Sequence, residues 1–130
     1  QLEKGDRVKL FEGSDGYEAG EQRRDFIYVD DVVKVNLWFK ENPEVSGIFN
    51  VGTGKSQTFN EVANSVINFH GKGSIQYIPF PKELVGSYQS FTEADIGKLR
   101  AAGYPDDFLD VQTGVQLYLE KLSNWPKNES

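Results

Sequence analysis

The sequence FNVGTGKSQTF, residues 49–59, contains the signals of a strand, a tight turn and a helix in direct succession. An apolar run at residues 47–51 ends at Gly52, and Gly54 follows after one residue. Closely spaced glycines are typical of tight turns because they adopt positive φ angles and allow close backbone approach. Thr58 then begins a Thr-x-x-Glu capping box, which marks the first turn of a helix. We therefore predict a strand over residues 47–51 that turns sharply into a helix.

Similar signals recur on both sides of this stretch. Apolar, β-rich segments bounded by turns predict strands, and apolar positions at helical spacing predict helices that start at capping residues and stop at Gly or Pro. On these criteria the strands lie at residues 8–11, 25–29, 47–51 and 75–80, and the helices lie at residues 30–42, 59–70, 92–102 and 111–122. Thr92 and Asp110 are the expected caps of the last two helices. Short strands that alternate with about four helices predict an α/β fold.

The glycines and Lys55 also look like the end of a phosphate-binding loop, and their spacing tests this possibility. A P-loop that ends at Gly54 requires a glycine at residue 49, where the chain has Phe49. The dinucleotide-binding fingerprint fails too, because its third glycine would fall on Gln57. We therefore interpret the glycines as an architectural turn, and Lys55 and Ser56 as solvated loop residues.

The composition excludes several function classes. The chain has 130 residues and a formal net charge of −6, which argues against a general nucleic-acid or anionic-membrane surface because these need clustered Lys and Arg. It contains no cysteine and a single histidine, His70, so a Cys-based metal site is excluded and a His-based site or a Ser-His-Asp triad nearly so. No apolar run reaches transmembrane length, and nothing near residue 1 resembles a signal peptide. We expect a soluble, cytoplasmic protein without nucleic-acid, membrane or metal partners.

Several strings together resemble a known enzyme family. RDFIYVDDVVKVNLWF, residues 24–39, precedes the glycine turn in the order found in the extended short-chain dehydrogenase/reductases that act on nucleotide sugars. The strings KLFEGS (9–14), IQYIPFP (75–81) and GSYQSFTEADIGKLRAAGY (86–104) narrow the resemblance to the ADP-heptose 6-epimerases of that family. The resemblance runs from residue 1 to about residue 123. One departure is the segment at residues 15–23, which is longer than the loop usual in the family.

The resemblance implies only part of an enzyme. No tyrosine of the chain begins the family's catalytic Tyr-x-x-x-Lys motif, and the N-terminal glycine-rich cofactor fingerprint is missing too. We therefore expect residues 1–125 to be the C-terminal, substrate-binding portion of the epimerase, with a polar tail at residues 126–130. The NADP-binding Rossmann part is expected to be absent from this chain. On this expectation, no residue of the chain is catalytic or binds the cofactor.

The family also implies what the complete protein does. NADP would take a hydride from C6 of the heptose and return it to the other face of the ketone. This interconverts ADP-D-glycero- and ADP-L-glycero-D-manno-heptose for the lipopolysaccharide core. The implied partner is the ADP-heptose nucleotide sugar, and the implied assembly is a homo-oligomer, the homopentamer of the family. This chain alone is expected to be inactive.

The resemblance assigns substrate-binding residues one at a time. Arg24 precedes Asp-Phe, where a guanidinium would form charge-assisted bonds to the pyrophosphate; the alternative is an exposed arginine paired with Asp25 or a nearby Glu. Tyr88 would reach the diphosphate or sugar with its hydroxyl, or is a half-buried loop aromatic. The segment that would line the ADP end, or else form a plain strand-end turn, consists of Phe11, Glu12, Gly13 and Ser14.

Two other functions stay open at this point. The chain could come from another nucleotide-sugar epimerase or dehydratase of the superfamily, which would prefer a UDP, GDP or dTDP sugar. It could also be a non-catalytic nucleotide-binding module on the same fold, which needs no catalytic Tyr-Lys pair. Base preference separates the first alternative from the ADP-heptose assignment. A Tyr-x-x-x-Lys motif and a glycine-rich fingerprint in the preceding part of the parent protein would exclude the second.

Overall fold

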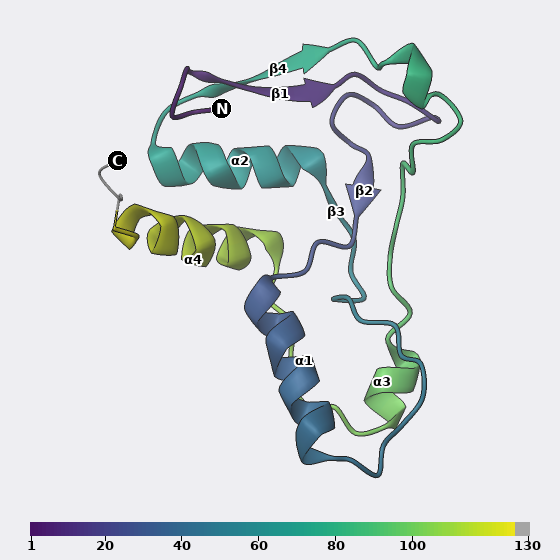
Figure 1. Ribbon diagram of the computed structural model, residues 1–130. Helices are drawn as coiled ribbons and strands as arrows, with labels where there is room; N and C mark the ends of the chain where they lie inside the picture. Colours follow the sequence, from purple (N-terminus) through teal and green to yellow (C-terminus); the bar gives the residue numbers. More distant parts are fainter. Residues whose placement is uncertain (127–130) are drawn as a thin grey trace.

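The computed structural model describes residues 1–126, and its elements form two groups joined by a short ladder (Figure 1). In the first group the parallel strands β1 and β4 lie beside α2, and α4 packs on the other side of α2. In the second group α1 and α3 lie at the opposite end of the molecule. The antiparallel pair β2 and β3 lies between the two groups. The elements are β1 (Arg7–Phe11), β2 (Arg23–Arg24), α1 (Val29–Glu41), β3 (Gln57–Thr58), α2 (Phe59–His70), β4 (Ser74–Ile78), the 3₁₀ turn η1 (Lys82–Leu84), α3 (Gly97–Ala101) and α4 (Val111–Asn124).

Most of the predicted polar tail, residues 127–130, lies outside the described residues. Within residues 1–126, no helix combines the length and the apolar character that crossing a membrane requires.

The helix after the glycine turn begins where the sequence predicts. The Thr58 hydroxyl accepts a hydrogen bond from the Glu61 amide at 3.1 Å, and the Glu61 carboxylate accepts one from the Thr58 amide at 2.7 Å. This reciprocal capping box satisfies two backbone amides, and Gly71, with φ of 67°, ends α2 in the left-handed conformation. Asp110 caps α4 by accepting from the Thr113 amide. Both helices are confirmed, because their caps depend only on residues close in sequence.

The main apolar core lies between α1 and α3. Val35, Leu99 and Tyr104 are almost fully buried there. Four aromatic side chains pack around them: Trp38, Phe39, Phe49 and Phe108. Asp31, which is 2% exposed, accepts a hydrogen bond from the Leu109 amide at 2.8 Å. This bond attaches the start of α1 to the segment that leads into α4.

Two of the four predicted strands are wrong. The strands at residues 8–11 and 75–80 are confirmed as β1 and β4. Residues 47–51 form no strand, because no other strand in the described part of the chain lies beside them, and Ile48 is 88% exposed. Residues 25–29 form none either, since the ladder is limited to Arg23–Arg24 and α1 already begins at Val29. A β-rich composition gives a strand only where a partner completes the backbone hydrogen bonds.

The helix predicted at residues 92–102 is much shorter than expected. α3 covers only Gly97–Ala101, and Thr92 is not its cap. The Thr92 amide instead donates to a carbonyl of β2 at 3.1 Å, and the Ala94 amide donates to the carboxylate of Asp25 at 3.1 Å. These bonds hold residues 92–94 beside β2, so their amides are not available for a helical turn.

Thr58→Ala is expected to lower the free energy of unfolding by about 1 kcal/mol, because it leaves the Glu61 amide without its capping oxygen. Thr58→Ser keeps that oxygen and should stay within about 0.5 kcal/mol of the parent. Urea unfolding followed by circular dichroism measures both variants. Equal losses in the two variants would show that the hydroxyl does not act as a cap.

Candidate functional site

Arg24 lies on β2, and no carboxylate of the described residues forms an ion pair with it. Its guanidinium lies 5.1 Å from the ring centroid of Tyr88 and 5.9 Å from that of Phe59, and Nη2 donates to the Gln89 carbonyl at 2.8 Å. Cation–π contacts hold such a group in place without neutralising it. The alternative pairing with Asp25 is therefore not formed, and the cation remains available to an anionic ligand.

The neighbouring Arg23 is used within the fold. Its Nε donates to the Ser56 hydroxyl at 3.0 Å, and Nη2 donates to the Ser56 carbonyl at 2.7 Å. Successive side chains of a strand point to opposite sides, so the two arginines of β2 meet different surroundings. Arg23 ties β2 to the end of the glycine turn, and Arg24 faces the aromatic side.

Phe11 and Tyr88 meet beside Arg24. Their ring centroids are 6.0 Å apart, and the ring of Phe80 lies 5.4 Å from Phe11 and 5.3 Å from Tyr88. A cavity of about 130 Å³ adjoins this cluster. We call it the Arg24 cavity; its lining residues are Lys9, Leu10, Phe11, Gly20, Gln22, Phe59 and Tyr88. Lys9, the first residue of the KLFEGS string, is the charged residue of this lining. Arg24 is not itself a lining residue, but its guanidinium lies against Phe59 and Tyr88, which are.

The loop after β1 uses its small residues to hold its own shape. A Cβ atom on Gly13 would collide with the Tyr17 carbonyl, so the close packing of this loop requires a glycine. The Ser14 hydroxyl lies 3.3 Å from the Ser90 hydroxyl. Glu12 is exposed, and its amide continues the β1–β4 ladder. Of the predicted ADP-binding segment, the structure brings the first residue to the cavity and places the next three in the loop that supports it.

Asp25 holds the glycine turn in place. Its Oδ1 accepts from the Thr53 amide at 2.8 Å and from the Thr53 hydroxyl at 2.6 Å. Its Oδ2 accepts from the Gly54 amide at 2.9 Å and from the Ala94 amide at 3.1 Å. Gly52 has no room for a side chain here, since a Cβ would lie 2.6 Å from the Ala94 Cβ and 2.7 Å from Oδ2 of Asp25. The glycines therefore surround a carboxylate that belongs to the chain itself.

The four backbone amides of residues 53–56 all donate to groups of the protein itself. The first two amides bind Asp25, the Lys55 amide donates to the Thr53 hydroxyl at 3.1 Å, and the Ser56 amide donates to Glu93 at 2.9 Å. The turn lines an open polar cavity of about 810 Å³, yet its donors are directed into the protein. The interpretation of the glycines as an architectural turn is confirmed. Lys55 is exposed as expected, but the interpretation of Ser56 as solvated is wrong, because it is 8% exposed and bonded to Arg23 and Glu93.

The hydrogen bonds to Asp25 decide its ionisation. Burial alone would raise the pKa of this carboxyl. The bonds from Thr53, Ala94 and Gly54 outweigh burial and lower the pKa below its ordinary value of 3.8. Asp25 is therefore ionised at neutral pH, as an acceptor of several backbone amides must be.

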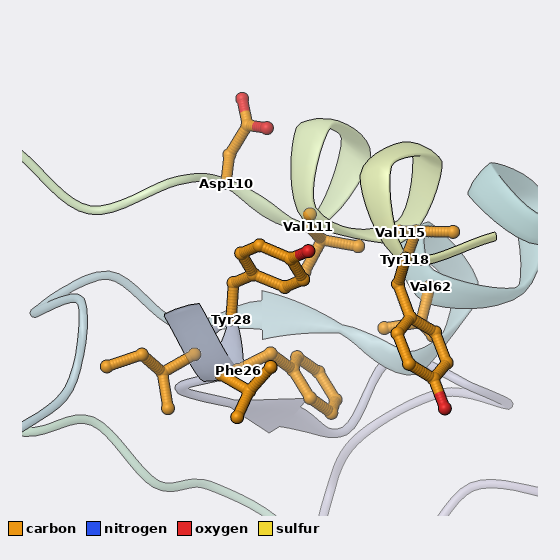
Figure 2. Close-up of a pocket in the computed structure, with 10 residues that line it drawn as sticks. Phe26, Tyr28, Val62, Asp110, Val111, Val115 and Tyr118 are labelled. Carbon is orange, nitrogen blue, oxygen red and sulfur yellow. The ribbon is translucent and has the colours of Figure 1, made fainter. Parts of the chain in front are cut away.

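A second cavity, of about 280 Å³, opens between the start of α1 and the first turns of α4. Its lining is mostly apolar, and Figure 2 shows Phe26, Tyr28, Val62, Val111, Val115 and Tyr118 around it, together with the carboxylate of Asp110. The Tyr28 hydroxyl is buried without a hydrogen-bond partner among residues 1–126. Such a groove does not fit a charged ligand. The Arg24 cavity is therefore the candidate site.

Comparison with known proteins gives these features a context. A sequence profile of the NAD dependent epimerase/dehydratase family matches residues 1–52. Over 126 residues, 97% of its length, the chain is 54% identical to the ADP-L-glycero-D-manno-heptose-6-epimerase of Alkalilimnicola ehrlichii. The chain is thus similar to proteins of the NAD dependent epimerase/dehydratase family. It spans 39% of the length of that relative.

Solved structures of related epimerases share the fold. The ADP-L-glycero-D-manno-heptose-6-epimerase of Helicobacter pylori matches with a TM-score of 0.72 at 28% identity, over 91% of this chain and 33% of that protein. The UDP-glucose 4-epimerase of Thermus thermophilus, in complex with NAD, matches with a TM-score of 0.73 at 26% identity, over 95% of this chain and 37% of that protein. The UDP-glucose 4-epimerase of Thermotoga maritima, with UDP-glucose, gives 0.71 at 28% identity, over 94% and 36%. The predicted α/β class is thereby confirmed.

Asp25→Asn is expected to lower the free energy of unfolding by about 2 kcal/mol at pH 7, because an amide replaces a charged acceptor. The pKa of Asp25 is lowered by folding. Its contribution is therefore fully present above the unfolded pKa, near 4, and is lost as the pH falls through the folded pKa. The difference between parent and variant should shrink from pH 5 to pH 3.

Urea unfolding at pH 7, 5 and 3 measures this difference. Asp107→Asn, which changes an exposed carboxylate, is the matched control and should differ little from the parent at any pH. A difference between parent and Asp25→Asn that stays constant down to pH 3 would contradict the assignment.

Proposed function

We propose that this chain is the substrate-binding portion of an ADP-heptose 6-epimerase, and that residues 1–125 hold the nucleotide end of ADP-heptose. The observation that carries the proposal is the uncompensated Arg24 guanidinium beside an aromatic cavity. The 54% identity to a protein named ADP-L-glycero-D-manno-heptose-6-epimerase supports the choice of substrate. The 130 Å³ cavity does not enclose a whole nucleotide sugar, so this chain would supply one wall of the complete site.

Each binding residue has a chemical role in this proposal. The Arg24 guanidinium donates charge-assisted hydrogen bonds to the pyrophosphate. The Tyr88 hydroxyl donates to the diphosphate or the sugar. The Tyr88 ring makes a cation–π contact with the guanidinium. Phe11 packs against the nucleotide, and Glu12, Gly13 and Ser14 shape the loop that bounds it.

The chain's own contribution to the reaction is positioning. Binding energy from the diphosphate, which does not react, holds the heptose carbon in place for the chemistry. NADP supplies the hydride acceptor and donor when it is bound. The glycine turn of this chain does not fit its pyrophosphate, because the amides of residues 53–56 already have acceptors. The cofactor and the catalytic Tyr-Lys pair would therefore belong to the remaining part of the parent, which we infer to be a cytoplasmic homo-oligomer in lipopolysaccharide core synthesis.

A UDP sugar is the second candidate substrate. It is favoured by the structural match to the Thermotoga maritima UDP-glucose 4-epimerase, solved with UDP-glucose. A guanidinium binds the diphosphate of either nucleotide, so Arg24 does not discriminate between them. The base must do so.

We expect this chain to bind ADP more tightly than UDP in calorimetric titrations, and Arg24→Ala to weaken ADP binding at least about tenfold. This estimate follows from the roughly 1.5–3 kcal/mol that a hydrogen bond to a charged group contributes. Arg7→Ala, which removes an exposed arginine of β1, is the matched control and should bind ADP like the parent chain. In the parent enzyme, Arg24→Ala should raise KM for the nucleotide sugar.

Preference for UDP would move the protein to another branch of the family. An unchanged KM in the Arg24→Ala enzyme would remove Arg24 from the site. A parent protein that binds ADP but has no epimerase activity would favour the non-catalytic nucleotide-binding module.

A further inference from the structure

Gln22 is a fully buried polar side chain that no sequence motif marks. It is 2% exposed and directly precedes β2. Its Nε2 donates to the Glu12 carbonyl at 3.0 Å and to the Ser14 hydroxyl at 3.2 Å. The reversed amide would place an oxygen against a carbonyl oxygen, so the hydrogen-bond partners fix the orientation of the side chain.

The hydrogen bonds beyond Gln22 form a chain with one direction. The Ser90 hydroxyl donates to the Asp15 carboxylate at 2.7 Å, and this uses its only proton. In the pair of hydroxyls 3.3 Å apart, Ser14 must therefore donate to Ser90. The order is Gln22 amide, Ser14 hydroxyl, Ser90 hydroxyl, Asp15 carboxylate. Each donated proton in this order has an acceptor, and the Asp15 carboxylate is the last acceptor.

This hydrogen-bond chain joins the two walls of the Arg24 cavity. Gln22 binds Glu12 and Ser14, in the loop that directly follows Phe11. Ser90, in the middle of the order, is 8% exposed, lies two residues beyond Tyr88 and bonds to Ser14 and Asp15 of that loop. Gln89, between Tyr88 and Ser90, accepts the hydrogen bond from Arg24. The phenylalanine and the tyrosine meet at 6.0 Å across this bridge.

The loop that this hydrogen-bond chain holds contains an unfavourable backbone conformation. Asp15 adopts φ of 51°, a left-handed conformation that residues other than glycine rarely take. The hydrogen bond from Ser90 holds this residue. Both segments pair their backbones elsewhere: the Glu12 amide bonds to the carbonyl of Ile78, and the Ser90 carbonyl accepts from the Arg23 amide. The hydrogen-bond chain of side chains therefore connects the loop at residues 12–15 to Ser90.

We propose that Gln22 is a positioning residue of the nucleotide-sugar site, which sets the separation of Phe11 and Tyr88 through the chain that ends on Asp15. The inference rests on the proposed function, because it takes the Arg24 cavity as the substrate site. Gln22 does not touch the substrate. It acts by holding the two walls in the spacing that the nucleotide end requires.

Gln22→Glu in the full-length parent enzyme is the test, because it keeps the shape of the side chain and removes both donated hydrogen bonds. The carboxylate oxygens would face the Glu12 carbonyl and the Ser14 hydroxyl, so the loop should move away from the segment at residues 88–90. We expect KM for ADP-heptose to rise about tenfold while kcat stays within about twofold, since the reacting carbon is bound by other residues. Gln116→Glu on exposed α4 is the matched control and should leave both constants unchanged.

Ser90→Ala gives a second test that leaves Gln22 bonded to Glu12. It interrupts the chain in the middle and should raise KM about threefold, again without a matching fall in kcat. Thermal unfolding shows whether each variant is folded. An unchanged KM in both variants, a fall in kcat at constant KM, or loss of folding in both would overturn the proposal. Arg24→Ala, measured in parallel, separates failure of the Gln22 proposal from failure of the proposed function. If Arg24→Ala leaves KM unchanged, the proposed substrate site itself is wrong.

Discussion

The carboxylate of Asp25 is the constraint on which the arrangement of the second half of the molecule depends. It binds the adjacent amides of Thr53 and Gly54 and the amide of Ala94, and so joins two segments that lie far apart in sequence. Gly52 must be a glycine because the carboxylate and Ala94 fill the space of a side chain. A phosphate-binding loop uses the same physics with an external anion. In this protein the anion is the Asp25 carboxylate, and the loop has a structural role.

The hydrogen bonds to Asp25 explain the position of the candidate site. Asp25 directly follows Arg24, so fixing the carboxylate also fixes the end of β2. Arg23 extends to one side and is held by Ser56, whereas Arg24 extends to the other and rests on Tyr88. The segment that supplies Tyr88 continues into residues 92–94, which the same carboxylate and β2 hold. A charged, uncompensated guanidinium is therefore kept in one place by a network that does not neutralise it.

The sequence predicted what depends on near neighbours and missed what depends on distant ones. α2 and α4 were predictable because Thr58 and Asp110 cap them through residues three positions away. Residues 47–51 carry a strand pattern but lack a partner within residues 1–126. Residues 92–94 are kept out of a helix by bonds to Arg23 and Asp25, which no local signal reveals. In the site, the resemblance singled out Arg24. It assigned no role to Lys9, although KLFEGS contains it, and Gln22 lies in no motif; both are visible only once β1, β2 and Tyr88 come together.

The most direct measurement is an amide NMR titration of this chain with ADP, because it locates the bound anion on the sequence. We expect shift changes at Phe11, Arg24 and Tyr88 to Ser90, and none at Thr53 to Ser56, whose amides are occupied by acceptors of the chain. Changes centred on Thr53 to Ser56, with Arg24 and Tyr88 unaffected, would show that the glycine turn binds phosphate after all. That result would contradict both the role of Asp25 and the location of the site.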